Sequence, residues 1–433
     1  MPLISPGLAE TTTAPEKAVV LSKAKGAMVI TQVCAQPFFS SFCDGIIVIA
    51  LPSMQSTLGL SEGLLGWPSS SYFLTAGSCL LLAGSVADVV GNKRVNLVGS
   101  FFSAVFAMAC GLSRSGGEII AFRALQGITN AIIALCAISI ISNNVEEGRP
   151  RNMGFAFMGF AQPLGFCFGL VLGGVFTDTV GWRPAFYLAA AASGTLFMLS
   201  IWALPQDTRS KTGPSVRKRL IHEIDCVGVV LASTGLASLA HVLASLSADI
   251  HNIHNISSMA LLAIAGCSIP LFVGWMHRQV NRDCTALIPN SLWKSHVFTS
   301  CCAMVLLTNA LANCMELYSS LFFQQVQEAS AIKASLQVVP SLVAAMSTVA
   351  PLLMALVRSN QLYWENAFFA QILTPISCDL LFTVGLLIIS DVFPRHMQAL
   401  GGAVFNTCAQ LGAAIGMSVT QVIASSMTRK SFS

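Results

Sequence analysis

Long apolar runs alternate with short polar stretches along the whole chain. The runs are about 20 residues long, which is the length that an α-helix needs to cross the hydrocarbon core of a bilayer. They are continuously apolar instead of alternating, which predicts membrane-spanning helices and not barrel strands. Twelve spans are predicted, at Ala27–Pro52, Trp67–Val86, Val95–Leu112, Ile119–Ile141, Met153–Phe176, Ala185–Leu204, Cys226–Leu246, Ile256–Met276, Val297–Phe323, Leu336–Val357, Ala367–Ile389 and Met397–Ala424.

The composition agrees with this pattern. Hydrophobic residues make up 54% of the 433 residues and charged residues only 10%, against roughly 25% charged residues in an average soluble domain. The mean hydropathy is +0.72. We therefore expect an all-α integral membrane protein with about 12 transmembrane helices.

Basic residues predict the orientation of the chain. With the N-terminus in the cytosol, fifteen Lys and Arg residues flank the first eight spans on the cytosolic side, and only Arg114 and Arg183 lie outside. This asymmetry follows the positive-inside rule for a multi-pass protein of the cell membrane. Residues 1–26 are polar and lack an apolar stretch, so we expect a cytosolic tail and not a signal peptide. The net charge of +4 then needs no nucleic-acid partner.

Asp44 and Arg123 are ionisable residues within predicted spans. Asp44 lies about seven residues, or roughly 10 Å, from the outer end of its span, and Arg123 about four residues from the outer end of its own. An ionisable group in hydrocarbon is costly and usually faces a partner or a wet cavity. We expect the two side chains to approach each other or to share a water network, with Asp44 taking up and releasing a proton. The alternative is a static structural pair.

Three further polar residues lie within spans, and we rank them Asp379, Glu316 and His241 as cavity or proton-pathway candidates. Glu316 is near the outer end of its span, so the alternative is that its carboxylate extends to the interface. A histidine such as His241 is more often a helix-packing residue than a proton relay.

No other chemistry is indicated. Walker sequences are absent, which argues against an ATP-driven pump. The sequence shows no cluster of catalytic residues of the kind that an enzyme needs. We expect neither a metal nor a cofactor, and most cysteines lie inside spans as small hydrophobic residues. Asn255-Ile256-Ser257 is a glycosylation sequon, although a chance match is slightly favoured because the loop is short.

The loop after the second span reads Gly84-Ser-Val-Ala-Asp88-Val-Val-Gly91-Asn-Lys93-Arg94. Its glycines allow a tight turn between two helices. Asp88 can sit against the positive N-terminal end of another helix, while Lys93 and Arg94 face the cytosol. This segment resembles the G-x-x-x-D-x-x-G-x-K/R signature of the major facilitator superfamily, which implies a helical bundle of two halves that switches conformation around this loop.

Other segments extend the resemblance over nearly the whole chain. Arg123-Ala-Leu-Gln126-Gly127 is similar to the superfamily's R-x-x-Q-G motif, and Ser377-Cys-Asp379-Leu-Leu-Phe382 to a stretch of a cavity-lining helix. Asp44-Gly-Ile-Ile-Val-Ile-Ala-Leu-Pro52 resembles a segment of the fourteen-span drug:proton antiporter branch, closest to fungal multidrug and metabolite exporters of the aminotriazole-resistance type. The fifth span resembles the antiporter motif of exporters through Gly159, Pro163, Gly165, Gly169, Gly173 and Gly174. Small residues at this spacing also pack helices closely in any membrane protein.

The chain departs from the fourteen-span pattern in its second half, where two spans are missing. The expected organisation is a cytosolic tail (1–26), a six-helix bundle (27–204), a basic cytosolic linker (205–224), two extra spans (225–276) and a shortened C-terminal bundle (277–433). Loss of one internal span reverses every later one. Unless the second half adapts, the helix near Met397 then presents its N-terminus to the wrong side to meet Asp88.

The resemblance implies proton-coupled efflux of small hydrophobic organic compounds, drugs or secondary metabolites, by alternating access. The expected partners are a small-molecule substrate, protons as the coupling ion and the lipid bilayer. Two alternatives stay open. One is facilitated uptake of a small nutrient, which the resemblance of the fifth span to the antiporter motif argues against. The other is a truncated remnant that does not transport.

Overall fold

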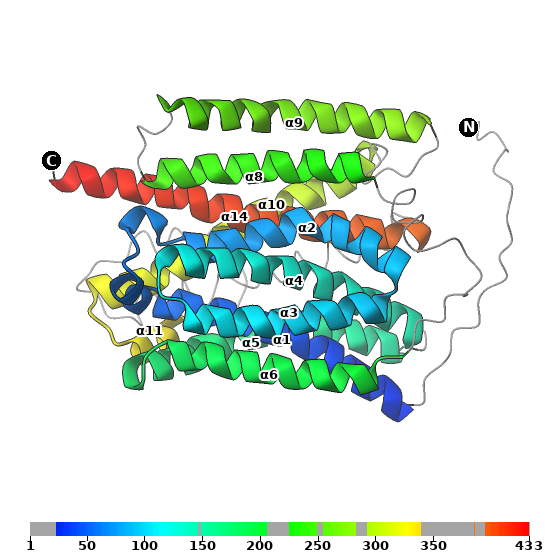
Figure 1. The fold of residues 1–433 in the computed structure, drawn as a ribbon, viewed down its shortest axis with the longest axis horizontal. Helices are drawn as coiled ribbons and strands as arrows, with labels where there is room; N and C mark the ends of the chain where they lie inside the picture. The colour runs from blue at the N-terminus through cyan, green and yellow to red at the C-terminus, as the bar shows by residue number, and fades with distance from the viewer. Residues whose placement is uncertain are drawn as a thin grey trace, which may run out of the picture.

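The computed structural model describes residues 23–145, 149–205, 225–248, 254–282, 292–338, 385 and 395–432, and within these ranges every regular element is helical (Figure 1). The expectation of an all-α bundle is confirmed. The long helices are α1 (Lys23–Leu58), α2 (Trp67–Val90), α3 (Asn92–Leu112), α4 (Gly116–Asn144), α5 (Arg149–Thr179), α6 (Arg183–Ala203), α8 (Cys226–Ala248), α9 (Ile256–Asn281), α10 (His296–Leu321), α11 (Ala331–Val338) and α14 (Arg395–Phe432). Short helical turns lie at Glu62–Leu64, Leu292–Lys294 and Phe322–Val326.

Eight helices in the described part of the chain are long and apolar enough to cross a membrane. The predicted span Ala367–Ile389, apart from Gly385, and most of Leu336–Val357 lie outside the described residues, so the count of twelve stays a prediction. The helices generally extend beyond the predicted runs. α1 begins at Lys23, inside the expected tail, and continues through Pro37 and Pro52 for 36 residues.

The helix ends gather at two faces of the bundle. At one face α1 and α3 begin and α6 ends, since Gln32 of α1 donates to Ser200 of α6 and Lys93 of α3 reaches the end of α6. We call this face the basic face. At the opposite face α1 ends beside the start of α6, where the Trp182 indole donates to Thr57 over 3.1 Å.

Glycines bring α1 and α5 together as parallel neighbours. A Cβ at Gly165 or Gly169 would meet the backbone carbonyl of Phe38 or Phe42, and Gly173 continues the same register one turn further on. Only a residue without a side chain permits this backbone approach. The spacing of small residues in the fifth span therefore has a direct packing cause.

The remaining members of that glycine–proline run lie on other sides of α5. Gly159 has no neighbour within 4 Å of an added Cβ, and Pro163 is half-buried. Gly174 faces Ala331 and Ser335 of α11, in the other half of the molecule. The run thus serves two interfaces, one within the N-terminal half (α1–α6) and one with the C-terminal half (α10, α11 and α14).

α14 begins at the basic face, beside the end of α2. Gln410 lies against Gly77 of α2 and Gln421 against Gly66, at the start of that helix, so α2 and α14 are antiparallel. Gly412 packs on the backbone of Leu306 and Gly416 on Ala310, so α14 is parallel to α10. Of the two alternatives left open by the sequence, the structure has the one in which the second half adapts and the last span is not reversed. Close glycine packing on α10 fixes the direction of α14, whereas counting spans along the chain predicted the opposite.

α8 and α9 form an antiparallel pair at the seam between the halves. The Asp225 carboxylate accepts from the Gly228 amide over 2.9 Å and from the Trp275 indole over 2.8 Å, which ties the start of α8 to α9. α8 packs against α2 and α14, and α9 is the outermost helix (Figure 1). The predicted extra pair therefore covers α2 and α14 on one side.

Two hydrogen bonds join α10 and the helical turn that follows it (Phe322–Val326) to α1 near the opposite face. The Ser320 hydroxyl donates to the Val48 carbonyl over 2.9 Å, and the Gln324 amide donates to the Ile49 carbonyl over 3.0 Å. Proline lacks an N–H, so Pro52 leaves the carbonyl of Val48, four residues earlier, without its helical partner. Ser320 supplies that partner from the other half.

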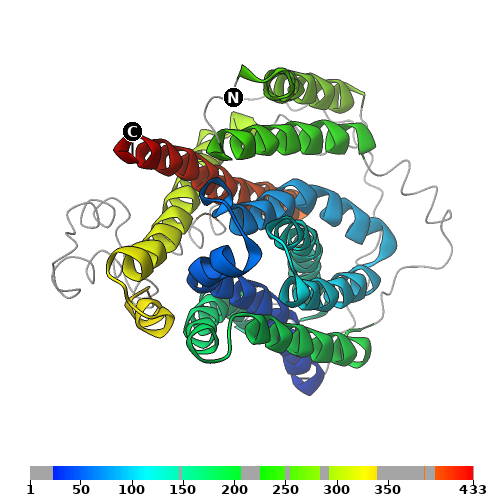
Figure 2. The ribbon, with the colours of Figure 1, turned by 60° about the vertical axis from the view of Figure 1, so that its left-hand side comes forward.

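A second contact between the halves lies beside the first. The Asp178 carboxylate, near the end of α5, accepts from the backbone amides of Ala331 and Ile332 over 3.1 and 2.9 Å. A carboxylate at a helix N-terminus satisfies free N–H groups and complements the helix dipole. Figure 2 shows α10 and α11 (yellow) alongside α1 and α5 at this end. We call these hydrogen bonds the cross-half contact.

The glycine packing predicts a position-specific loss of stability. Gly169→Ala places a methyl group against the Phe42 carbonyl and lowers the free energy of unfolding by about 1–3 kcal/mol through overpacking. Gly159→Ala, on the same helix but in open space, leaves it unchanged or slightly higher. Thermal unfolding of the purified variants compares the two; equal midpoints would contradict the packing.

The cross-half contact predicts how Pro52 and Ser320 depend on each other. Ser320→Ala leaves the Val48 carbonyl unpaired and weakens the contact by about 1–3 kcal/mol. Backbone amides of residues 320–332 then exchange faster with deuterium, measured by mass spectrometry. In a Pro52→Ala background the same substitution has a smaller effect, because the new N–H pairs with Val48. Pro37→Ala, which supplies an N–H to a carbonyl of α1 far from α10, is the control. Unchanged exchange in Ser320→Ala argues against the contact.

Candidate functional site

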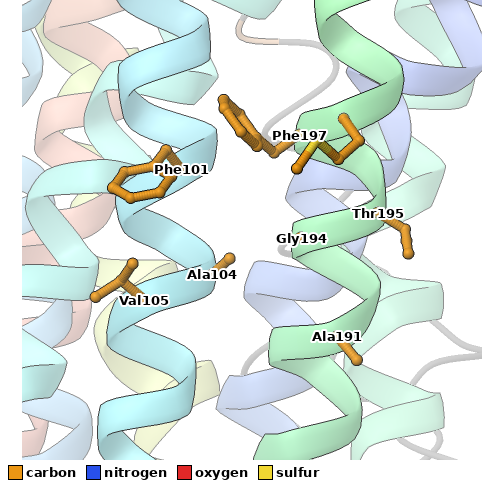
Figure 3. Close-up of a pocket in the computed structure, with 8 residues that line it drawn as sticks. Phe101, Ala104, Val105, Ala191, Gly194, Thr195 and Phe197 are labelled. Atoms are coloured by element: carbon orange, nitrogen blue, oxygen red, sulfur yellow. The ribbon is translucent and has the colours of Figure 1, made fainter.

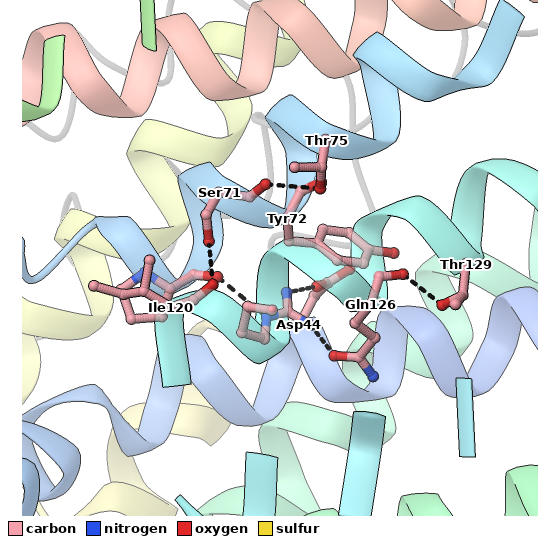
Figure 4. A network of polar contacts seen from close by, with 9 residues as sticks. Asp44, Ser71, Tyr72, Thr75, Ile120, Gln126 and Thr129 are labelled. Atoms are coloured by element: carbon pink, nitrogen blue, oxygen red, sulfur yellow. Dashed lines mark hydrogen bonds and ion pairs between the residues drawn. The ribbon is translucent and has the colours of Figure 1, made fainter. Parts of the chain in front are cut away.

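An ion pair lies inside the N-terminal half, between α1 and α4. The Arg123 guanidinium donates to the Asp44 carboxylate, so the structure brings together the two ionisable residues that sequence depth placed at similar levels. The Arg123 side chain is fully buried and that of Asp44 is 12% exposed. Figure 4 shows Asp44 among side chains from α2 and α4.

Arg123 uses further partners on α2 and α4. Its Nε donates to the Pro68 carbonyl over 3.1 Å and its Nη1 donates to Gln126 Oε1 over 2.8 Å. The guanidinium carbon lies 4.2 Å from the centre of the Tyr72 ring, which is a cation–π distance. The cation is therefore held in place even when Asp44 changes its protonation state.

Gly127 explains why α2 and α4 approach closely enough for these contacts. A Cβ at this position would meet the Tyr72 carbonyl and the Thr75 hydroxyl. The Thr75 hydroxyl donates to the Ala124 carbonyl over 2.7 Å. The Ser71 hydroxyl donates to the Ile120 carbonyl over 3.2 Å (Figure 4). The R-x-x-Q-G pattern thus combines the cation, its amide partner and the residue that permits close packing.

Burial makes the pair sensitive to protonation. Two opposite charges removed from water stabilise each other only as long as both are present, and removing one partner of a buried pair typically costs about 3–5 kcal/mol. A proton added to Asp44 therefore changes the balance of forces on α1 and α4. Of the two groups only the carboxylate can accept a proton, because the guanidinium is already protonated.

A polar stripe precedes Asp44 on α1 and was missed by reasoning from the sequence. Four polar residues follow one another at intervals of four: Gln32, Gln36, Ser40 and Asp44. The exposed fractions of these residues, backbone included, are 0%, 1%, 5% and 8%. Residues four apart share one face of a helix. The spacing was visible in the sequence, but no charge drew attention to it.

The loop between α2 and α3 turns at Gly91, whose φ of 110° favours glycine. Arg94 is exposed, as expected, but Lys93 is half-buried and donates to the carbonyls of Ile201 and Leu204 over 3.2 and 2.6 Å. Lys93 thus caps the end of α6 at the basic face, because that helix end offers carbonyls to a cation. The expectation that Lys93 and Arg94 face the cytosol stays a prediction.

Gly84 and Asp88 lie on the last two turns of α2, and their side-chain surroundings lie outside the described residues. The antiparallel register of α2 and α14 continues to a position where Asp88 is level with the first two turns of α14. The arrangement that the motif needs, with Asp88 near a helix N-terminus, is thus compatible with the backbone.

The other predicted polar residues are dispersed. Glu316, on α10, is half-buried and within electrostatic range of the Cys167 thiol of α5. Asp379 and the side chain of His241 lie outside the described residues. Asn255 is exposed at the start of α9, and its glycosylation stays a prediction. Within the described ranges no three His, Cys, Asp or Glu side chains form a metal site.

An apolar groove of about 470 Å³ separates α3 from α6. Figure 3 shows Phe101 and Val105 on one side and Gly194, Thr195 and Phe197 on the other. Phe101 is 46% exposed. The groove lies on the outer surface of the N-terminal half, where hydrocarbon covers apolar side chains, and it is separate from the buried ion pair.

Known proteins resemble this chain over most of its length. It is 35% identical to MFS-type transporter 1 of Pyricularia oryzae over 461 aligned positions, which cover 94% of this chain and 75% of that protein. It is 34% identical to the puromycin resistance protein pur8 of Streptomyces alboniger over 46% of this chain and 38% of that protein.

A solved structure supports the fold. An auto-inhibited POT family peptide transporter superposes with a TM-score of 0.62 at 13% identity, covering 94% of this chain and 90% of that one. The model of the Major Facilitator Superfamily matches residues 33–359. Together with the helical bundle and its motifs, these matches show a membrane transporter and not an enzyme. The chain belongs to the Major Facilitator Superfamily.

Proposed function

We propose that this transporter exports small hydrophobic organic compounds from the cell in exchange for protons. The observation that carries the proposal is the buried pair of Asp44 and Arg123, because an isolated, exchangeable charge pair inside a transporter half is suited to couple protonation to movement. The similarity to a resistance protein, pur8, supports the outward direction.

Alternating access supplies the mechanism. The cross-half contact closes the opposite face through hydrogen bonds from α10 to α1 and from α11 to α5. Asp44 is one turn from Val48 on α1, so a change of charge at Asp44 acts on the helix that also carries the contact. We assign Glu316 and Asp379 to the substrate cavity.

The loop motif is assigned to the conformational switch. Gly91 provides the turn, Lys93 holds the end of α6, and Asp88 stabilises the N-terminal end of α14 in one of the two conformations. Gly84 and Arg94 complete the motif. Gly165, Gly169 and Gly173 of α5 then form the close-packed surface between α1 and α5.

The basic face is assigned to the cytosolic side of the cell membrane, with the N-terminus in the cytosol, because lysines and arginines lie there. The proposed organisation is the one expected from the sequence: a tail (1–26), a six-helix bundle (27–204), a linker (205–224), an extra helix pair (225–276) and a shortened C-terminal bundle (277–433).

Asp44→Asn tests the coupling. The substitution keeps a hydrogen-bond acceptor for Arg123 but cannot exchange a proton, so proton-driven efflux falls by at least about 100-fold. Asp44→Glu, which retains a carboxylate, keeps part of the activity. Cells with each variant are loaded with a panel of fluorescent lipophilic compounds, and retention is measured with and without a protonophore.

One control and three outcomes frame this experiment. A cooperative thermal transition of the purified variant, even at a lower midpoint than in the wild type, shows that Asp44→Asn remains folded. Lower dye retention in cells with the wild-type protein, abolished by the protonophore, is the expected result. Higher retention in those cells would favour uptake, and undiminished efflux by Asp44→Asn would exclude the proposed role of this carboxylate.

A further inference from the structure

The polar stripe on α1 reaches from Asp44 toward the basic face. We propose that Gln32, Gln36 and Ser40 hold a file of buried water molecules that carries protons between the basic face and the Asp44 carboxylate. This inference rests on the proposed proton coupling and adds the route that the proton takes, with water as the bound ligand.

The spacing of the stripe fits single water molecules between neighbouring side chains. Four residues of α-helix rise by about 6 Å, and a water molecule that bridges two polar groups through two hydrogen bonds spans about 5.6 Å. The three intervals from Gln32 to Asp44 therefore each have room along the axis for one bridging water. The stripe covers about 18 Å in total.

Unpaired amide atoms point to bound water at the middle of the stripe. Both side-chain polar atoms of Gln36, and Oε1 of Gln32, are buried without a protein hydrogen-bond partner. Buried amides in folded proteins are satisfied, and where protein groups do not satisfy them ordered water does. Gln32 donates its Nε2 to Ser200 of α6, so its amide is held in one orientation.

Both ends of the stripe are suitably placed. Met28, one turn before Gln32, is 40% exposed, so the stripe comes within one turn of the protein surface. At the other end Ser40 lies close to Tyr72, whose ring contacts Arg123 of the ion pair. The charged and titratable groups around the Asp44 carboxylate are Arg123 of α4, Tyr72 of α2 and Cys43 of α1.

The transfer balances without a redox partner. An excess proton on water at the basic face moves along the file, each water molecule giving one proton to the next, and the last O–H bond forms on the Asp44 carboxylate. Release toward the basic face reverses these steps: the carboxyl O–H bond breaks, and the carboxylate is left paired with Arg123. In exchange for a compound that leaves the cell, the proton arrives at Asp44 from the opposite face and takes this release direction. The glutamines and Ser40 orient the water molecules and exchange no net proton.

Gln36→Leu tests the route, because it removes both unpaired polar atoms at similar volume. The full-length protein in lipid nanodiscs is subjected to a rapid pH jump, and the Asp44 carboxyl band, identified by its absence in Asp44→Asn, is followed by time-resolved infrared spectroscopy. Loss of a hydrogen-bonding position in the file slows protonation of Asp44 by about tenfold or more.

The midpoint of the Asp44 titration separates a route from a structural effect. Gln36 lies about 12 Å along the helix from Asp44. Gln36→Leu therefore changes the rate of protonation and leaves the midpoint of the Asp44 titration unchanged. The thermal stability of the variant is at least as high as that of the wild type. Gln36→Asn restores the rate to within about threefold, because it keeps an amide in the file. Thr31→Val, at an exposed position on the same helix, is the matched control.

Each outcome decides a different statement. Protonation of Gln36→Leu at the wild-type rate overturns the proposed file, and so does a shift of midpoint without a change of rate. If no Asp44 band titrates in the wild-type protein, the proposed coupling itself fails, whatever the behaviour of Gln36.

Discussion

Hydrocarbon offers no hydrogen bonds, and this constraint decides where each polar group inside the bundle must go. Arg123 meets Asp44, Gln126 and the Pro68 carbonyl, and so joins α4 to α1 and α2. The Val48 carbonyl, which Pro52 leaves unpaired, meets Ser320 of the other half. Polar groups that one helix cannot satisfy thus become the contacts that hold different helices, and the two halves, together.

α1 collects most of these contacts and is therefore the centre of the proposed mechanism. Its glycine-packed side rests on α5, its Asp44 meets Arg123, and its Pro52 turn meets α10. One rigid helix carries the charge pair and the cross-half contact only one turn apart. Rearrangement at either place reaches the other through the helix backbone, without a longer chain of intermediate residues.

Much of this was predictable from residue type and spacing. Depth along two spans was enough to bring Asp44 and Arg123 together, and the small residues of the fifth span indicated close packing. The direction of α14 was not predictable by counting spans, because glycine contacts with α10 fix it. The contact of Lys93 was not predictable for a similar reason, since its partners are backbone carbonyls of a distant helix. Ser320 and Gln36 carry no signal in isolation; their meaning depends on Pro52 and on the stripe that ends at Asp44.

The central claim is that compound and proton cross the same protein in opposite directions. Purified protein in liposomes, given a gradient of a fluorescent lipophilic compound that it transports and a pH-sensitive dye in the lumen, tests this most directly. We predict that protons move in the direction opposite to the compound and that the proton flux disappears when the compound is left out. Movement of the compound with no proton flux, or with protons in the same direction, would contradict the account.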